Sequence, residues 1–346
     1  MNVVAARAAG ENRARLTMVR LLCAATVWRT AMTQLLPLCG GAAWWVTLIG
    51  LLPGFGVAAL LKWTMRRTGA QTLTEGIRAC WGQVGAWGIS LFLAALLLSE
   101  GLASMTALIT LFTQGVGSRG TPLTLALLTG CAMLFSMHRE GLPRAVHLLR
   151  WGIVAAIAVL AGCLLPEVRL DHLFPLYGAG EDAVMTAMQV GFGLGWSVVL
   201  LLTVPPDPGG RLRSAVLPAA MAVSALLLLT LIVPQELLQE RGSLASLLLL
   251  PTRYATNGLR VLYLCTTMLV IFLSIAACVH LATEYLCAPM KKRPDWLRYL
   301  LLAMLILMQL LDPGQLYAML AKVQSVLFVV LAGAAMISVL CRRENA

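Results

Sequence analysis

Long apolar stretches, separated by short polar segments, occur throughout the chain. A membrane-spanning helix needs about 20 mostly apolar residues, and ten stretches approach or exceed that length. The predicted spans are residues 16–36, 43–61, 86–112, 122–138, 149–166, 183–204, 214–234, 258–287, 296–311 and 317–341. Pro, Gly and Asp residues cluster between spans, as at 205–210 and 312–314, where connections are expected. The pattern therefore predicts an all-α integral membrane protein of about ten transmembrane helices.

Composition and charge support this reading and give it an orientation. Of the 346 residues, 60% are hydrophobic and 12% are charged, whereas soluble domains carry about 25% charged residues. The net charge of +11 comes from short basic clusters between apolar stretches. This pattern argues against a continuous nucleic-acid-binding surface. If the N-terminus is cytoplasmic, 19 of the 26 Lys and Arg residues fall on the cytoplasmic side and six on the outer side. Both termini are therefore predicted to lie in the cytoplasm.

The outer loop 167–182 divides the ten spans into two groups of five. Because five is odd, two copies of a five-helix unit must be inverted relative to each other, as in many secondary transporters. We thus expect a 5+5 inverted-repeat bundle of the LeuT/APC type. The expected organisation is a cytoplasmic tail at 1–15, a single permease domain at 16–341 with repeats at about 16–166 and 183–341, and a second cytoplasmic tail at 342–346.

The sixth span contains three glycines at alternate positions, Gly191, Gly193 and Gly195. Glycine weakens a helix by about 1 kcal/mol relative to alanine, so the run favours local unwinding near the midplane. Close helix packing through small residues is the alternative. In inverted-repeat transporters the substrate binds at discontinuous helices in equivalent positions, here spans one and six.

Two ionisable residues lie near the middle of predicted spans, Arg29 in the first and Glu100 in the third. A charge at a helix centre costs about 2.5–3.5 kcal/mol on insertion scales, so a partner or a water-filled cavity is expected. Both residues lie about 20 Å from the cytoplasmic edge at about 1.5 Å per residue. They are therefore placed to form an ion pair. The alternatives are that each lines a polar cavity separately, or that Arg29 extends toward the outer surface.

The chain lacks the motifs of known catalytic and metal sites. No H-E-x-x-H, G-x-S-x-G or phosphate-binding loop occurs, and the nine cysteines contain no C-x-x-C pair. We expect no enzymatic activity, no cofactor and no metal site. Before the third span, Thr72-Leu-Thr-Glu75 matches a helix capping box and predicts a short helix at the cytoplasmic face, with a polar loop as the alternative.

Several stretches, in order along nearly the whole chain, resemble the GerAB-type B subunits of spore germinant receptors, which are permeases of the amino acid–polyamine–organocation superfamily. The strongest is Asp171-His-Leu-Phe-Pro-Leu-Tyr-Gly-Ala-Gly180, before the sixth span. The others are Ala43-Trp44-Trp45, Gln71-Thr-Leu-Thr-Glu75, Thr121-Pro122, Arg139-Glu-Gly141-Leu-Pro-Arg144 and the stretch from Gly193 to Pro205. The resemblance implies a ten-helix inverted-repeat fold, binding of a small germinant such as an amino acid, and A- and C-type partner subunits in the spore inner membrane.

This chain departs from that family at two places. Trp196 stands where the family usually has an acidic residue, and the first span lacks the usual glycines and carries Arg29. We expect the ligand site between the middles of spans one and six. Its expected residues are Ala25, Thr26, Gly191, Gly193, Gly195 and Trp196. Three functions remain open: a germinant-receptor B subunit, a stand-alone proton- or cation-coupled amino-acid transporter, and a membrane scaffold with a vestigial transport site.

Overall fold

The computed structural model describes residues 3–115, 130, 141–174, 178–204, 211–234, 238, 257–288, 296–309, 324–326, 328–334 and 336. All regular structure in these residues is helical. Within the described ranges, five helical stretches are long and apolar enough to cross a membrane: Gly10–Thr68, Leu73–Thr113, Gly141–Glu167, Glu181–Thr203 and Asn257–Cys287. The chain is thus built from membrane-spanning helices. The predicted span 122–138 lies outside the described residues except for Gly130, as do much of 317–341 and the tail at 342–346.

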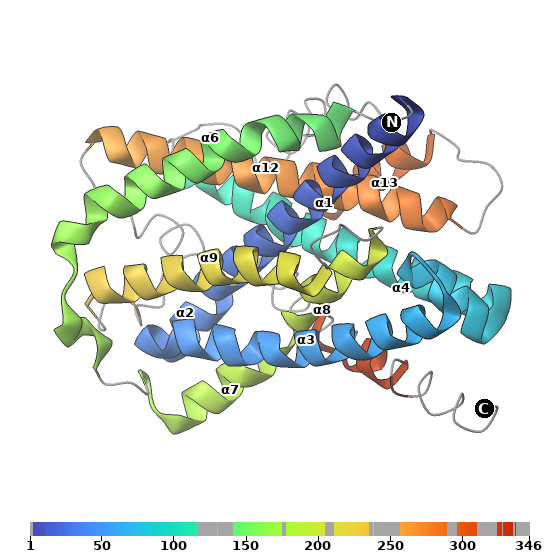
Figure 1. Cartoon of the computed structure of the whole chain (residues 1–346). Helices are drawn as coiled ribbons and strands as arrows, with labels where there is room; N and C mark the ends of the chain where they lie inside the picture. Colours follow the sequence, from blue (N-terminus) through green and yellow to red (C-terminus); the bar gives the residue numbers. More distant parts are fainter. Residues whose placement is uncertain are drawn as a thin grey trace.

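The first long stretch contains two helices that run in opposite directions. Helix α1 (Val3–Thr30) crosses the bundle diagonally and continues as a π-helical segment, η1 (Ala31–Leu35) (Figure 1). The short α2 (Leu36–Cys39) and η2 (Gly40–Ala42) make the turn, and α3 (Ala43–Thr68) returns along one side of the bundle. Gly40 has φ = 55°, which glycine adopts without the strain of a side chain. Residues 3–15, expected as a tail, are helical and continuous with the first span.

Helix α4 (Leu73–Thr110) begins with the predicted capping box and bends soon afterwards. The backbone N–H of Glu75 donates to the Thr72 hydroxyl, and the Glu75 carboxylate accepts from the Thr72 backbone N–H. Gly82, with φ = 70°, separates the short first helix from the long second one. The prediction of a short capped helix before the third span is therefore confirmed. Helix α4 continues into a second π-helical segment, η3 (Leu111–Gly115).

The sixth predicted span is an interrupted helix. Its parts are α7 (Glu181–Phe192), α8 (Gly195–Val199) and the 3₁₀ turn η6 (Leu200–Thr203). At the interruption, the N–H groups of Gly193 and Leu194 donate to the carbonyls of Val190 and Gly191, three residues back. The backbone of both residues remains in the right-handed helical region. The helix is tightened here, and it contains no extended segment.

Four further long helices lie in the described residues. They are α6 (Gly141–Leu164), α9 (Arg211–Ile232), α12 (Asn257–Cys287) and α13 (Trp296–Met308). Helix α4 packs along α12, and α1 lies among α6, α9 and α12 (Figure 1). Helix α6 presents exposed large apolar side chains such as Leu148, Trp151 and Val159. Such a face suits a lipid environment, so the interior of the bundle lies around α1, α4, α8 and α12.

Candidate functional site: a buried charged network between the first, third and tenth predicted spans

A buried ion pair joins α1 to α4 in the interior of the bundle. Arg29 Nε donates to Glu100 Oε1 at 3.0 Å, and Nη2 donates to Oε2 at 2.6 Å. The relative exposures of the two residues are 2% and 0%. A two-pronged contact of this kind is among the stronger charge-assisted hydrogen bonds in proteins. Of the three arrangements considered for these charges, the structure shows direct pairing.

Glu100 also receives hydrogen bonds from neutral side chains. Ser104, one turn along α4, donates to Oε1 at 3.3 Å. Gln324 donates from Nε2 to Oε2 at 3.1 Å and also contacts Ser99 Oγ at 3.3 Å. Removing a carboxylate from water is costly unless its oxygens are well paired. We call Arg29, Ser99, Glu100, Ser104 and Gln324 the buried network; it ties three separate parts of the chain together.

Sequence reasoning identified the two charges of this network but missed Gln324. This glutamine falls in the last predicted span, 317–341, where an amide in a mostly apolar stretch is a usable signal. The signal does not name a partner, because hydropathy says nothing about which helices are neighbours. Ser325, the next residue, was missed for the same reason.

Thr26 lies three residues before Arg29 on α1, so the two side chains share one helical face. Its exposure is 0%, and its hydroxyl oxygen has no hydrogen-bond partner among the residues that the structure describes. Buried hydroxyls are usually paired, so one that is not calls for an explanation. Ala25, also expected in the ligand site, is buried on the same helix.

Two of the three glycines in the sixth span serve helix packing. Gly50 and Gly54 of α3 face Gly191 and Gly195, so two Gly-x-x-x-Gly pairs meet in register. A Cβ on Gly50 would lie 2.6 Å from the Gly191 carbonyl oxygen, and one on Gly54 would lie 2.5 Å from that of Gly195. Small residues of this spacing allow the backbones of two helices to approach closely. Close packing, the alternative to unwinding, therefore accounts for Gly191 and Gly195.

Gly193 lies on a different side of the sixth span, toward the buried network. A Cβ at this position would lie 2.7 Å from Ser325 Oγ, and Ser325 follows the Gln324 that binds Glu100. The same span contacts α1, because the Cys23 thiol donates to the Ser197 carbonyl at 2.7 Å. The interruption at Gly193–Leu194 therefore lies beside the elements that carry the network.

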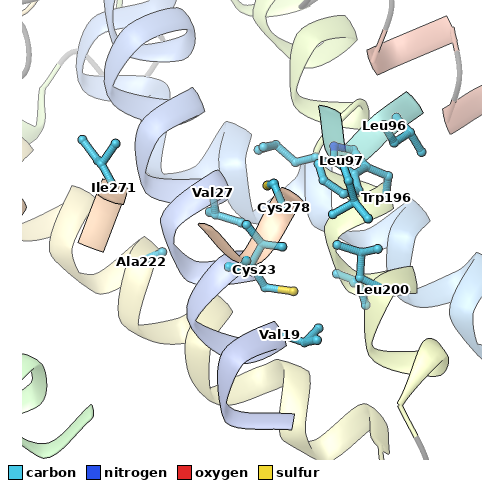
Figure 2. Packing of buried hydrophobic residues seen from close by; sticks show 14 of the residues in the cluster. Val19, Cys23, Val27, Leu96, Leu97, Trp196, Leu200, Ala222, Ile271 and Cys278 are labelled. Carbon is cyan, nitrogen blue, oxygen red and sulfur yellow. The ribbon is translucent and has the colours of Figure 1, made fainter. Parts of the chain in front are cut away.

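Trp196 lies in α8, directly after the interruption at Gly193–Leu194, and is part of the apolar core. It is 1% exposed, and Figure 2 shows it within the cluster that also contains Cys23 of α1, Leu97 of α4 and Cys278 of α12. Trp196 thus occupies the centre of the helix bundle with an apolar ring. The structure brings four of its helices together at this point.

A second polar cluster closes one end of the bundle. Arg15 Nη2 lies 2.8 Å from Glu284 Oε1, which joins the N-terminal part of α1 to the end of α12. Glu284 also lies 3.7 Å from His280 Nε2. Near it, the Thr17 hydroxyl lies 3.2 Å from His147 Nδ1 of α6. These contacts hold α1, α6 and α12 together at the end where α1 begins.

Metal-binding side chains do not gather anywhere in the described part of the chain. No group of three or more His, Cys, Asp or Glu residues in these ranges could hold a metal ion. The buried network has a single carboxylate, and Arg29 already neutralises it.

Comparison with solved structures reveals the fold. Crystal structures of three mutants of a manganese transporter from Eremococcus coleocola superpose on this chain with TM-scores of 0.56, 0.54 and 0.57. Sequence identity is 14–15%, and each match covers 95% of this chain and 77% of the transporter. The chain has the fold of a membrane transporter. At this identity the similarity is one of fold alone. No protein-family model matches the chain, and no curated protein matches it.

Proposed function

We propose that this chain is the permease-fold B subunit of a spore germinant receptor. In this role it binds a small germinant, an amino acid, inside the bundle and signals through A- and C-type partner subunits in the spore inner membrane. The transporter fold supports the permease part of the proposal. The ordered motifs, from Ala43 to Pro205, support the germinant-receptor part.

The observation that carries the ligand-binding proposal is the convergence of the first, third and tenth predicted spans on one buried charged network. Arg29, Glu100 and Gln324 come from three distant segments, and the interrupted helix at Gly193 lies beside them. Intramembrane ionisable residues that face a bundle interior commonly mark substrate or ion pathways. This arrangement also favours binding over catalysis, so we infer that the chain is not an enzyme.

The proposal includes a ten-helix, 5+5 inverted-repeat topology with both termini in the cytoplasm. In such a topology, spans two and six both run from outside to inside. The parallel register of Gly50 with Gly191 and Gly54 with Gly195 supports this directionality. Cysteine-accessibility labelling of the loops at 69–71 and 178–180 tests it. The first loop is expected to react only from the cytoplasmic side, and the second only from outside.

Germination of a deletion strain tests the role directly. Spores that lack this chain are expected to lose their response to at least one amino acid in a panel of twenty. Plasmid-borne wild-type chain is expected to restore the response, and the A- and C-type subunits are expected to co-purify with it. Unchanged germination with every member of the panel would rule out an amino-acid germinant receptor.

A stand-alone cation- or proton-coupled amino-acid transporter is the second candidate, favoured by the transporter fold of the structural neighbours. Liposomes that contain only this chain separate the two proposals. Concentrative uptake of a labelled amino acid supports the transporter, whereas binding without uptake supports the receptor. Neither binding nor uptake, with normal assembly of the partner subunits, would indicate a scaffold with a vestigial site.

A further inference from the structure

Among the described residues, the charges of the buried network balance before any ligand arrives. Glu100 supplies one negative charge and Arg29 one positive charge, and the donors from Ser104 and Gln324 are neutral. A ligand with a net charge would leave an uncompensated charge in a buried place, which is strongly unfavourable. A net-neutral ligand avoids this cost, and one that carries both charges can exchange partners with the pair.

We propose that Arg29 and Glu100 form the recognition site for a zwitterionic α-amino acid. The ligand separates the two side chains and becomes the new ion-pair partner of each. The ligand carboxylate binds the Arg29 guanidinium, and the ligand ammonium binds the Glu100 carboxylate. This inference rests on the proposed function, and it identifies the two charged groups of the ligand that the site binds.

The geometry of the existing pair fits this exchange. Arg29 already presents Nε and Nη2 to two oxygens of one carboxylate, at 3.0 and 2.6 Å. The α-carboxylate of an amino acid offers the same two-oxygen acceptor. When Arg29 is taken by the ligand, Glu100 retains its hydrogen bonds from Ser104 and Gln324 and gains the ligand ammonium.

Thr26 supplies an acceptor that no described residue of the protein uses. Its hydroxyl oxygen is buried and has no hydrogen-bond partner in the described part of the chain, and it lies one turn from Arg29 on the same face of α1. An ammonium group has three N–H donors, and only one is needed for Glu100. In the proposed complex, the Thr26 oxygen accepts a second one.

Two helices beside the network have an irregular backbone, which allows local movement when a ligand binds. The π-helical segment η1 starts two residues after Arg29, and α7 is interrupted at Gly193–Leu194. Single-turn π segments inside α-helices are frequent at functional sites. Separation of Arg29 from Glu100 can be absorbed at these two places without breaking a continuous α-helix.

The same charge balance argues against a divalent cation as the ligand. The network offers one carboxylate that is already paired with an arginine, and the described residues contain no cluster of metal ligands. The site therefore differs in chemistry from what a manganese substrate would need. Manganese chloride serves as a negative probe below.

Binding to the purified full-length chain in lipid nanodiscs tests the proposal. Each of the twenty amino acids is added singly, and the best binder is compared with its carboxamide, its N-acetyl derivative and manganese chloride. The zwitterion is expected to bind at least about tenfold more tightly than either capped form, because each cap removes one charged hydrogen bond. Equal affinity of a capped form would overturn the proposal, as would tighter binding of manganese.

Two variants separate recognition from folding. Arg29→Met with Glu100→Leu removes both charges together, so no buried charge is left unpaired and the fold is expected to survive. The affinity of this double variant for the amino acid is expected to be lower by about tenfold or more. Thr26→Val removes a hydroxyl that has no protein partner, so it is expected to weaken binding without lowering the melting temperature. Unchanged affinity in the double variant would overturn the proposal.

Complementation of the deletion strain distinguishes failure of this inference from failure of the proposed function. If wild-type chain restores an amino-acid response and the double variant restores it equally well, the chain is a receptor whose site lies elsewhere. If deletion has no effect on any amino-acid response, the proposed function itself fails. Loss of the response in the double variant, with normal protein level, supports both.

Discussion

Gln324 Nε2 lies 3.1 Å from Glu100 Oε2, although 224 positions separate the two residues in the chain. Gln324 follows Glu100 in the chain, whereas Arg29 precedes it. Arg29 contacts both carboxylate oxygens from α1. Glu100 is thus the point at which α1, α4 and the segment beginning at Gln324 are joined. A fully satisfied buried carboxylate of this kind favours one arrangement of the three segments.

Replacement of Gln324 by Leu is expected to destabilise the protein while preserving side-chain volume. The change removes one hydrogen bond to a buried carboxylate, worth about 1.5–3 kcal/mol. The apparent melting temperature in detergent, followed by size-exclusion chromatography, reports the loss. Val326→Ala is the matched control, because Val326 is two residues away and 63% exposed. Equal melting temperatures for Gln324→Leu and the control would show that the amide contributes nothing to the fold.

Reversal of the Arg29–Glu100 pair tests its contribution to the fold. Arg29→Glu or Glu100→Arg alone places two like charges together in the interior, and each is expected to cost at least the roughly 3–5 kcal/mol of a broken buried pair. The double variant restores opposite charges and is expected to recover much of the loss. The yield and melting temperature of the four proteins form a double-mutant cycle. If the double variant were no better than the worse single one, the two residues would not be coupled.

The sequence located this pair better than it located the packing around it. Arg29 and Glu100 are exceptional residues in apolar spans, and helical rise alone placed them at the same depth. Gln324 is a polar residue in an apolar span and Gly54 is one of many small residues, but only the three-dimensional arrangement of helices shows what each of them faces. Local signals such as the Thr72 capping box were readable because both partners lie within one turn.

The glycines of the sixth span show where sequence reasoning reaches its limit. Their alternate spacing suggested unwinding, and the helix is indeed interrupted at Gly193–Leu194. Gly191 and Gly195, however, are four apart and meet an equally spaced pair on α3. Both interpretations rest on the same three residues, because glycine permits irregular backbone and also close approach. The neighbouring helix decides which interpretation applies to each glycine, and the sequence alone does not identify that neighbour.

Gly54→Ala is expected to disrupt the contact between α3 and the sixth span. The added methyl group would lie 2.5 Å from the Gly195 carbonyl oxygen, and the nearby atoms are backbone. The helices must therefore move apart, and overpacking of this kind typically costs about 1–3 kcal/mol. Gly56→Ala is the control on the same helix, because a methyl group there meets no atom within 4 Å. That control is expected to match or exceed wild-type stability, since alanine is the better helix former.

Equal melting temperatures for Gly54→Ala and Gly56→Ala would contradict the close contact. A second readout keeps the test specific. Cysteines at positions 50 and 191 in a Cys-free background are expected to be difficult to accommodate. A pair at exposed positions of α3 and α6, Leu52 and Val154, is expected to express normally. The two pairs change the same number of residues, but only the first faces a closely approached helix.

Thr72→Ala is expected to fray the short helix at the start of α4 without affecting the rest of that helix. The Thr72 hydroxyl accepts from the Glu75 N–H, and its loss removes one half of the capping box. Loss of an N-cap typically costs about 0.5–2 kcal/mol. Gly82, with φ = 70°, interrupts the helix and confines the fraying to the residues before it. Amide hydrogen exchange in residues 73–81 is expected to accelerate about twofold to thirtyfold, with no change in residues 90–108. Thr72→Ser, which keeps the hydroxyl acceptor, is expected to exchange like wild type; equal acceleration in both variants would show that the cap does not hold this helix.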